Sequence, residues 1–96
     1  MNFGEALQEV KSGKLVARNG WNGKGMWLSI VREDDYSISD SGDAMPPDFT
    51  GKLLAWIGLQ TAHGDFTPWQ PSQQDMLSDD WMVVRDKGGW LIASQA

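Results

Sequence analysis

The 96-residue sequence contains no cysteine, only one histidine and no long apolar segment. Without cysteine the chain forms neither a disulfide nor a cysteine-ligated zinc site, so neither can reinforce its core. No segment approaches the ~18 apolar residues of a membrane-spanning helix, and the first residues lack the apolar stretch of a secretory signal. These absences favour a single domain over residues 1–96 that works in the cytoplasm and contacts no membrane.

The chain is also short, and short chains bury a small fraction of their surface when they fold. With disulfides and zinc excluded, association with further copies of the chain is the remaining route to more buried area. We therefore expect a homo-oligomer.

Basic residues are in the minority, and the formal net charge is −5. The charge is uneven, because residues 33–51 hold six of the thirteen acidic residues and no basic one. The rest of the chain has eight basic and seven acidic residues, a net charge of +1. Such a surface does not neutralise the phosphates of DNA or RNA, but it is compatible with one compact phosphorylated ligand in a local pocket.

The N-terminal segment has the pattern of an amphipathic helix. Asn2 and Glu5 have the spacing of a reciprocal helix cap, and apolar residues then recur at helical spacing. Gly13 suits the position just after a helix end. The sequence therefore predicts a helix over residues 3–12.

The remaining segments favour strands, so we expect an α+β fold in which the N-terminal helix packs on a bent antiparallel sheet. Ser72 and Asp75 repeat the capping spacing and predict a short helix, ending near Leu77, before a C-terminal hairpin. A long loop is expected over residues 33–51. Strands are expected at residues 15–17, 26–32, 53–61, 66–67, 81–85 and 90–93, with a further short one near Tyr36 and Ile38.

Residues suited to catalysis are sparse, and no nucleophile–base–carboxylate set or metal-ligand cluster can be assembled from the sequence. His63 lies in a predicted hairpin turn, where its ring is solvated. Asp75, Asp79 and Asp80 could serve acid–base chemistry or bind magnesium, but a simpler interpretation is available. In this simpler interpretation, Asp75 caps a helix, and Asp79 and Asp80 keep the turn before the last hairpin solvated.

Six tryptophans against one tyrosine make the indoles the most informative feature. Trp27, Trp56 and Trp81 fall within strand patterns and are predicted to lie in the core, while Trp90 suits either the core or an interface. The other two are Trp21 and Trp69, which lie in turns flanked by glycine or proline. Either these two cover the end of the sheet, or they form the walls of a slot for a planar ligand such as a purine.

The surroundings of Trp21 favour a nucleotide over a sugar or a peptide. Arg18 and Lys24 bracket the indole and could meet phosphates. The backbone N–H groups of Gly20, Gly23 and Gly25 can approach a ligand closely because no Cβ blocks them. The glycine spacing matches neither the Walker loop nor the dinucleotide fingerprint.

Two stretches together resemble a known family. They are K-L-V-A-R-N-G-W-N-G-K-G-M-W-L at residues 14–28 and Q-T-A-H-G-D-F-T-P-W-Q-P-S-Q-Q-D-M-L-S-D-D-W at residues 60–81. Both resemble small phage and prophage proteins of a family that includes the second type of anti-Thoeris protein. The resemblance covers nearly the whole chain.

The resemblance implies a sponge that binds glyco-cyclic ADP-ribose, the signal of Thoeris immune enzymes, and holds it intact. It also implies a homotetramer with pockets where protomers meet and, for some members, separate sites for cyclic oligonucleotides. Neither a catalytic residue nor a cofactor is then expected. Carried over by motif, the pocket residues would be Trp21, Asn22 and Lys24, faced by Thr61, Ala62, Asp65 and Trp69.

One departure bears on affinity. Members of the family commonly have a lysine before the turn that begins at Thr61, and Gln60 stands there in this chain. If that lysine holds phosphate, this chain would bind more weakly or prefer another isomer. Two other functions stay open: a small nucleotide hydrolase that uses Asp75, Asp79 or His63, and an interaction module that inserts Trp21 and Trp69 into a partner protein.

Overall fold

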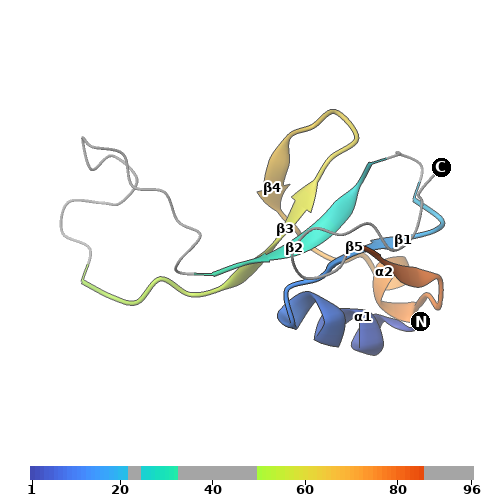
Figure 1. The fold of residues 1–96 in the computed structure, drawn as a ribbon, viewed down its shortest axis with the longest axis horizontal. Helices are drawn as coiled ribbons and strands as arrows, with labels where there is room; N and C mark the ends of the chain where they lie inside the picture. The colour runs from blue at the N-terminus through green and yellow to red at the C-terminus, as the bar shows by residue number, and fades with distance from the viewer. Residues whose placement is uncertain (22–24, 33–49, 86–96) are drawn as a thin grey trace.

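The computed structural model describes residues 1–21, 25–32 and 50–85 (Figure 1). The strand expected near Tyr36 and Ile38 and the last strand, at residues 90–93, lie outside the described residues. Within the described ranges the chain is α+β, as predicted, with two helices and a five-stranded antiparallel sheet. None of the helices described is both long enough and apolar enough to span a bilayer.

Helix α1 spans Phe3–Lys11 and begins with the reciprocal cap expected from the sequence. The Asn2 side chain accepts a hydrogen bond from the backbone N–H of Glu5 at 2.8 Å, and the Glu5 carboxylate accepts one from the backbone N–H of Asn2 at 2.9 Å. Gly13 has a φ of 100° just after the helix end, a conformation that favours glycine. The predicted start is confirmed, and the helix ends at Lys11, one residue before the predicted end, with Ser12 as its C-cap.

The sheet has the strand order β4-β3-β2-β1-β5, so the first and last described strands are neighbours. Strand β3 (Trp56–Gln60) is shorter than the expected 53–61, since neither residues 53–55 before it nor Thr61 after it have strand structure. A register irregularity lies between Leu15 and Val16 where β1 pairs with β5. The strands are β1 (Leu15–Arg18), β2 (Trp27–Val31), β3 (Trp56–Gln60), β4 (Phe66–Pro68) and β5 (Trp81–Arg85).

The core lies between α1 and one face of the sheet. Its fully buried members include Val10 on α1, Val16 on β1, Leu28 on β2 and Trp81 on β5. Val16 is the register partner of both Leu28 and Val83, so these side chains share the helix-covered face. Trp81 is 2% exposed, which confirms its predicted core position.

The prediction that Trp27 and Trp56 lie in this core is wrong. Both are half-buried, and both contact Phe66 on the opposite face, with ring centroids 6.1 and 5.9 Å from it. Side chains alternate along a strand, so Leu28 and Ile57 take the helix-covered face and their tryptophan neighbours take the other. Both helices lie on the same side of the sheet, so the face with the tryptophans is not covered by either (Figure 1).

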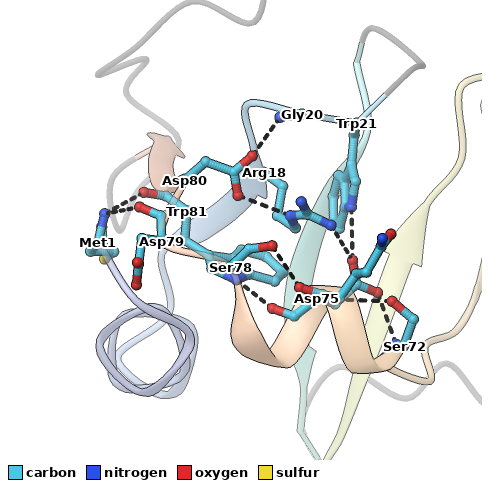
Figure 2. A network of polar contacts seen from close by, with 11 residues as sticks. Met1, Arg18, Gly20, Trp21, Ser72, Asp75, Ser78, Asp79, Asp80 and Trp81 are labelled. Atoms are coloured by element: carbon cyan, nitrogen blue, oxygen red, sulfur yellow. Dashed lines mark hydrogen bonds and ion pairs between the residues drawn. The ribbon is translucent and has the colours of Figure 1, made fainter.

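Helix α2 spans Gln73–Leu77 and follows the second predicted cap. The Ser72 hydroxyl accepts from the backbone N–H of Asp75 at 3.0 Å, and the Asp75 carboxylate accepts from the backbone N–H of Ser72 at 2.9 Å. The helix is one short turn beside the start of β5. It therefore holds the Asp75 side chain against the end of strand β1 (Figure 2).

Candidate functional site

Arg18, the last residue of β1, pairs with two carboxylates from the C-terminal part of the chain (Figure 2). Its Nη1 donates to Asp75 Oδ1 and its Nε to Asp80 Oδ1, each at 2.9 Å. The Arg18 and Asp75 side chains are only 16% and 13% exposed, so this pair is largely shielded from water. Three of the five guanidinium N–H groups have no bond to these two carboxylates.

Trp21 reaches the same carboxylate from the turn that follows β1. Its indole Nε1 donates to Asp75 Oδ1 at 3.3 Å, and its backbone N–H donates to the carbonyl oxygen of Arg18 at 3.2 Å. The residue is half-buried. The single oxygen Asp75 Oδ1 therefore binds both predicted ligand residues, the arginine and the indole.

The interpretation of Asp80 as a solvating turn residue is wrong. Besides accepting from Arg18, the Asp80 carboxylate accepts from the backbone N–H of Gly20 at 2.8 Å. A Cβ at Gly20 would lie 2.8 Å from Asp80 Oδ2, so only glycine allows this approach without a shift. One of the glycine amides expected to face a ligand is therefore bonded within the chain.

The contacts change the acidity of both carboxyl groups. Burial works to raise the pKa of Asp75, but hydrogen bonds from Ser72, Arg18 and Trp21 outweigh it and hold the pKa below its ordinary value. The hydrogen bond from Arg18 is the main cause that lowers the pKa of Asp80. Both groups are therefore ionised at neutral pH, and the pKa of Arg18 is raised in turn, first by Asp80.

Trp81 brings together the two tryptophans that the sequence singled out as ligand walls. The Trp21 ring meets it edge-on with centroids 5.4 Å apart, and the Trp69 ring does so at 6.0 Å. Phe3 of α1 packs against both Trp69 and Trp81. Trp81 Nε1 donates to the backbone carbonyl of Asp75 at 2.9 Å. Trp21 and Trp69 thus flank one buried indole.

Within the described ranges, no hydrogen bond, ion pair or ring contact joins Thr61, Ala62 or Asp65 to this cluster. Thr61, Ala62 and Asp65 form the turn between β3 and β4, which is closed by a backbone hydrogen bond of 2.8 Å from Thr61 to Asp65. The Thr61 hydroxyl also accepts from the backbone N–H of Asp65. Trp27 pairs with Gln60, so this turn lies at the sheet end where β2 begins. Asn22, Gly23 and Lys24 lie outside the described residues.

Sequence reasoning favoured a capping role for Asp75, with acid–base chemistry as the alternative, and missed its contacts with Arg18 and Trp21. These contacts join residues 57 and 54 positions apart, and no local pattern signals them. Residues 1–21, 25–32 and 50–85 contain no group of three acidic, histidine or cysteine side chains suited to a metal ion.

Fold and site together define a small α+β protein with one helix-covered sheet face and an ionic network that anchors a half-buried indole. The chain belongs to the Tad2-like family, described as the Thoeris anti-defense 2-like domain, which matches residues 1–84. It is 39% identical over 85 residues to a protein named Thoeris anti-defense 2 from Bacillus phage SP01, covering 88% of this chain and 94% of that protein. This membership confirms the resemblance found in the sequence and supports an anti-Thoeris role.

Proposed function

We propose that this chain binds a nucleotide immune signal of the glyco-cyclic ADP-ribose type in the cytoplasm of an infected bacterium and holds it uncleaved. Thoeris immunity would then fail because its effector never receives the signal. The observation that carries the proposal is the Trp21 indole, half-buried and bonded at Nε1 to the same carboxylate that binds Arg18. A fixed aromatic face beside a guanidinium suits a base next to a phosphate.

In this proposal the base stacks on Trp21, and the guanidinium N–H groups of Arg18 that do not bind Asp75 or Asp80 donate to phosphate. Trp69, whose ring packs edge-on against the same Trp81, contributes the second aromatic wall. The remaining ligand contacts come from Asn22, Gly23, Lys24, Thr61, Ala62 and Asp65.

The carboxylates argue against the alternative of a small nucleotide hydrolase. Asp75 and Asp80 are bonded to Arg18, and the lowered pKa of each makes it a poor general acid and a weak base at neutral pH. His63 is exposed in the turn between β3 and β4. Within the described ranges no hydrogen bond joins it to Asp75, Asp79 or Asp80, so no acid–base pair is assembled there.

The alternative of an interaction module is also less well supported. That function needs Trp21 and Trp69 to project outward into a partner protein. Both rings instead pack edge-on against Trp81, and the Trp21 N–H is bonded to Asp75. An indole held in this way offers one face to a flat ligand more readily than its whole surface to a protein pocket.

A capture-and-release experiment tests the proposed function. Purified protein mixed with glyco-cyclic ADP-ribose should deplete it from solution, and heating the complex should return the same molecule, as identified by mass spectrometry. Trp21→Ala should weaken binding about tenfold, because base–aromatic stacking is worth roughly 1–3 kcal/mol. Leu77→Ala, an exposed position on α2, serves as the matched control and should bind like the unmodified protein. Recovery of a cleaved product, or full affinity in Trp21→Ala, would contradict the proposal.

We also propose that the chain assembles as a homotetramer. The sheet face opposite the helices supports this, because it carries Trp27, Trp56 and Phe66, and Phe66 is 45% exposed. Contiguous apolar surface on a small protein marks a contact site. Sedimentation velocity should give four times the chain mass, and Phe66→Lys should reduce it while Leu77→Lys should not. A wild-type protein that sediments as one chain would overturn the assembly.

A further inference from the structure

Asp75 is shared between two parts of the molecule that are distant in sequence (Figure 2). Its Oδ2 accepts from the backbone N–H of Ser72 in the helix cap. Its Oδ1 accepts from Arg18 Nη1 at 2.9 Å and from Trp21 Nε1 at 3.3 Å. Each oxygen has a partner and the residue is only 9% exposed, so the carboxylate is held in one orientation.

The Trp21 side chain needs such an anchor because it comes from a turn and not from a strand. On its inner side the ring meets only the edge of Trp81 among the aromatic contacts of the described residues. An edge-on contact of this kind sets the distance of an indole but leaves its rotation about χ2 broad. The hydrogen bond to Asp75 removes that freedom, because it directs the N–H edge inward and leaves the ring in one plane.

We propose that Asp75 is the positioning residue for Trp21, fixing the plane of the indole on which the ligand stacks. The inference rests on the proposed function for its ligand, whereas the orientation of the ring can be measured without one. Asp75 itself does not touch the ligand. It acts on the stacking face through the indole N–H, beside its ion pair with Arg18, whereas Trp21 and Arg18 make the ligand contacts themselves.

The orientation is tested first in the ligand-free protein, by nuclear magnetic resonance of the six indole N–H groups. Trp21→Phe identifies the Trp21 signal by its loss. In Asp75→Ala that signal should move upfield because its acceptor is gone, while the Trp81 signal should stay, since its acceptor is the backbone carbonyl of Asp75. Ser72→Ala is the matched control, because it weakens the same helix cap and leaves the acceptor of Trp21 in place.

An unmoved Trp21 signal in Asp75→Ala would overturn the assignment. If Asp75→Ala also moves the Trp81 signal, the helix has been disturbed, and Asp75→Asn is used instead. The neutral amide keeps the size of the side chain. Toward Arg18 and Trp21 it presents either a carbonyl, which is a weaker acceptor than a carboxylate, or an NH2 group, which accepts no hydrogen bond. The Trp21 signal is then expected to shift with Trp81 unchanged, and a Trp21 signal that stays in place again overturns the assignment.

The second arm measures affinity for glyco-cyclic ADP-ribose by calorimetry in a double-mutant cycle. Asp75→Ala should weaken binding about tenfold in the wild-type background, the effect of losing one hydrogen bond to a charged group. In the Trp21→Phe background, where the N–H is already absent, the loss should be clearly smaller, and what remains measures the effect of Asp75 on Arg18. Equal losses in both backgrounds would overturn a role through the indole. If the wild type binds no signal yet the spectra behave as stated, the proposed function fails and the orientation by Asp75 stands.

Discussion

Arg18→Met is expected to lower the free energy of unfolding by about 3 kcal/mol, because removal of one partner of a shielded ion pair strands the other charge. Methionine keeps most of the apolar stem but leaves the carboxylates of Asp75 and Asp80 without the cation that both of them bind. Urea unfolding followed by tryptophan fluorescence measures the loss. Asp80→Asn added to Arg18→Met should recover part of the stability, since one of the two stranded charges is then absent.

Lys14→Met is the matched control for this substitution. Lys14 pairs with Glu9 at 2.8 Å, but these side chains are 33% and 32% exposed, so water screens the pair. The change should alter the free energy of unfolding by no more than about 0.5 kcal/mol. Equal losses in Arg18→Met and Lys14→Met would show that the network is no more than a surface ion pair.

Arg18→Met should also change how the free energy of unfolding depends on pH. The pKa values of Asp75 and Asp80 lie below the ordinary 3.8 in the folded protein, so these groups stabilise it above that pH. The stabilisation is lost as pH falls below the ordinary pKa and through the lower folded-state pKa. Without Arg18 both pKa values move up, so the stability of Arg18→Met should fall less steeply with acidification. Parallel curves for the two proteins would contradict this account.

Gly58→Ala is expected to lower the free energy of unfolding by about 2 kcal/mol, an overpacking cost. Gly58 is buried in the middle of β3, and a Cβ there would lie 2.2 Å from Cζ of Phe66. The Phe66 ring would have to leave the strand and give up its contacts with Trp27 and Trp56. Thermal unfolding should show a midpoint lower by about 8–16 °C.

Two comparisons isolate the steric cause. Gly4→Ala lies in α1, where a Cβ would approach only Asn2 Oδ1, at 3.4 Å, so stability should stay the same or rise by about 0.5 kcal/mol. In a Phe66→Ala background the blocking ring is gone, and Gly58→Ala should cost nothing further. A full loss in that background would place the clash elsewhere.

The helices illustrate what could be read from the sequence. Asn2 with Glu5, and Ser72 with Asp75, satisfy their own backbone N–H groups within three residues, so the pattern contains all the information that the helix starts need. The described strands were found from their composition, but the predicted core position was right for Trp81 and wrong for Trp27 and Trp56. Neighbouring residues of a strand point to opposite faces of the sheet, and the core-facing one depends on the face that the helix covers. The sequence of a single strand does not predict that face.

For the candidate site, the sequence predicted the donors of the network but not the role of their acceptors. The sequence singled out Trp21, Trp69 and Arg18 from their residue types and turn context, and the structure brings all three around Trp81 and Asp75. The acceptors Asp75 and Asp80 were interpreted as a cap and a solvating residue. Their partners come from the other end of the chain, and pairing between β1 and β5 creates the contact.

The sequence by itself determined the helix boundaries, the α+β class and the family, because each rests on residues that are neighbours along the chain or on a motif of fixed spacing. Only the tertiary structure decided which carboxylate holds the Trp21 indole and which tryptophans stay outside the core. The physical reason is that hydrogen bonds and burial act over a few ångströms of space. Residues more than fifty positions apart reach that range only after the sheet has formed.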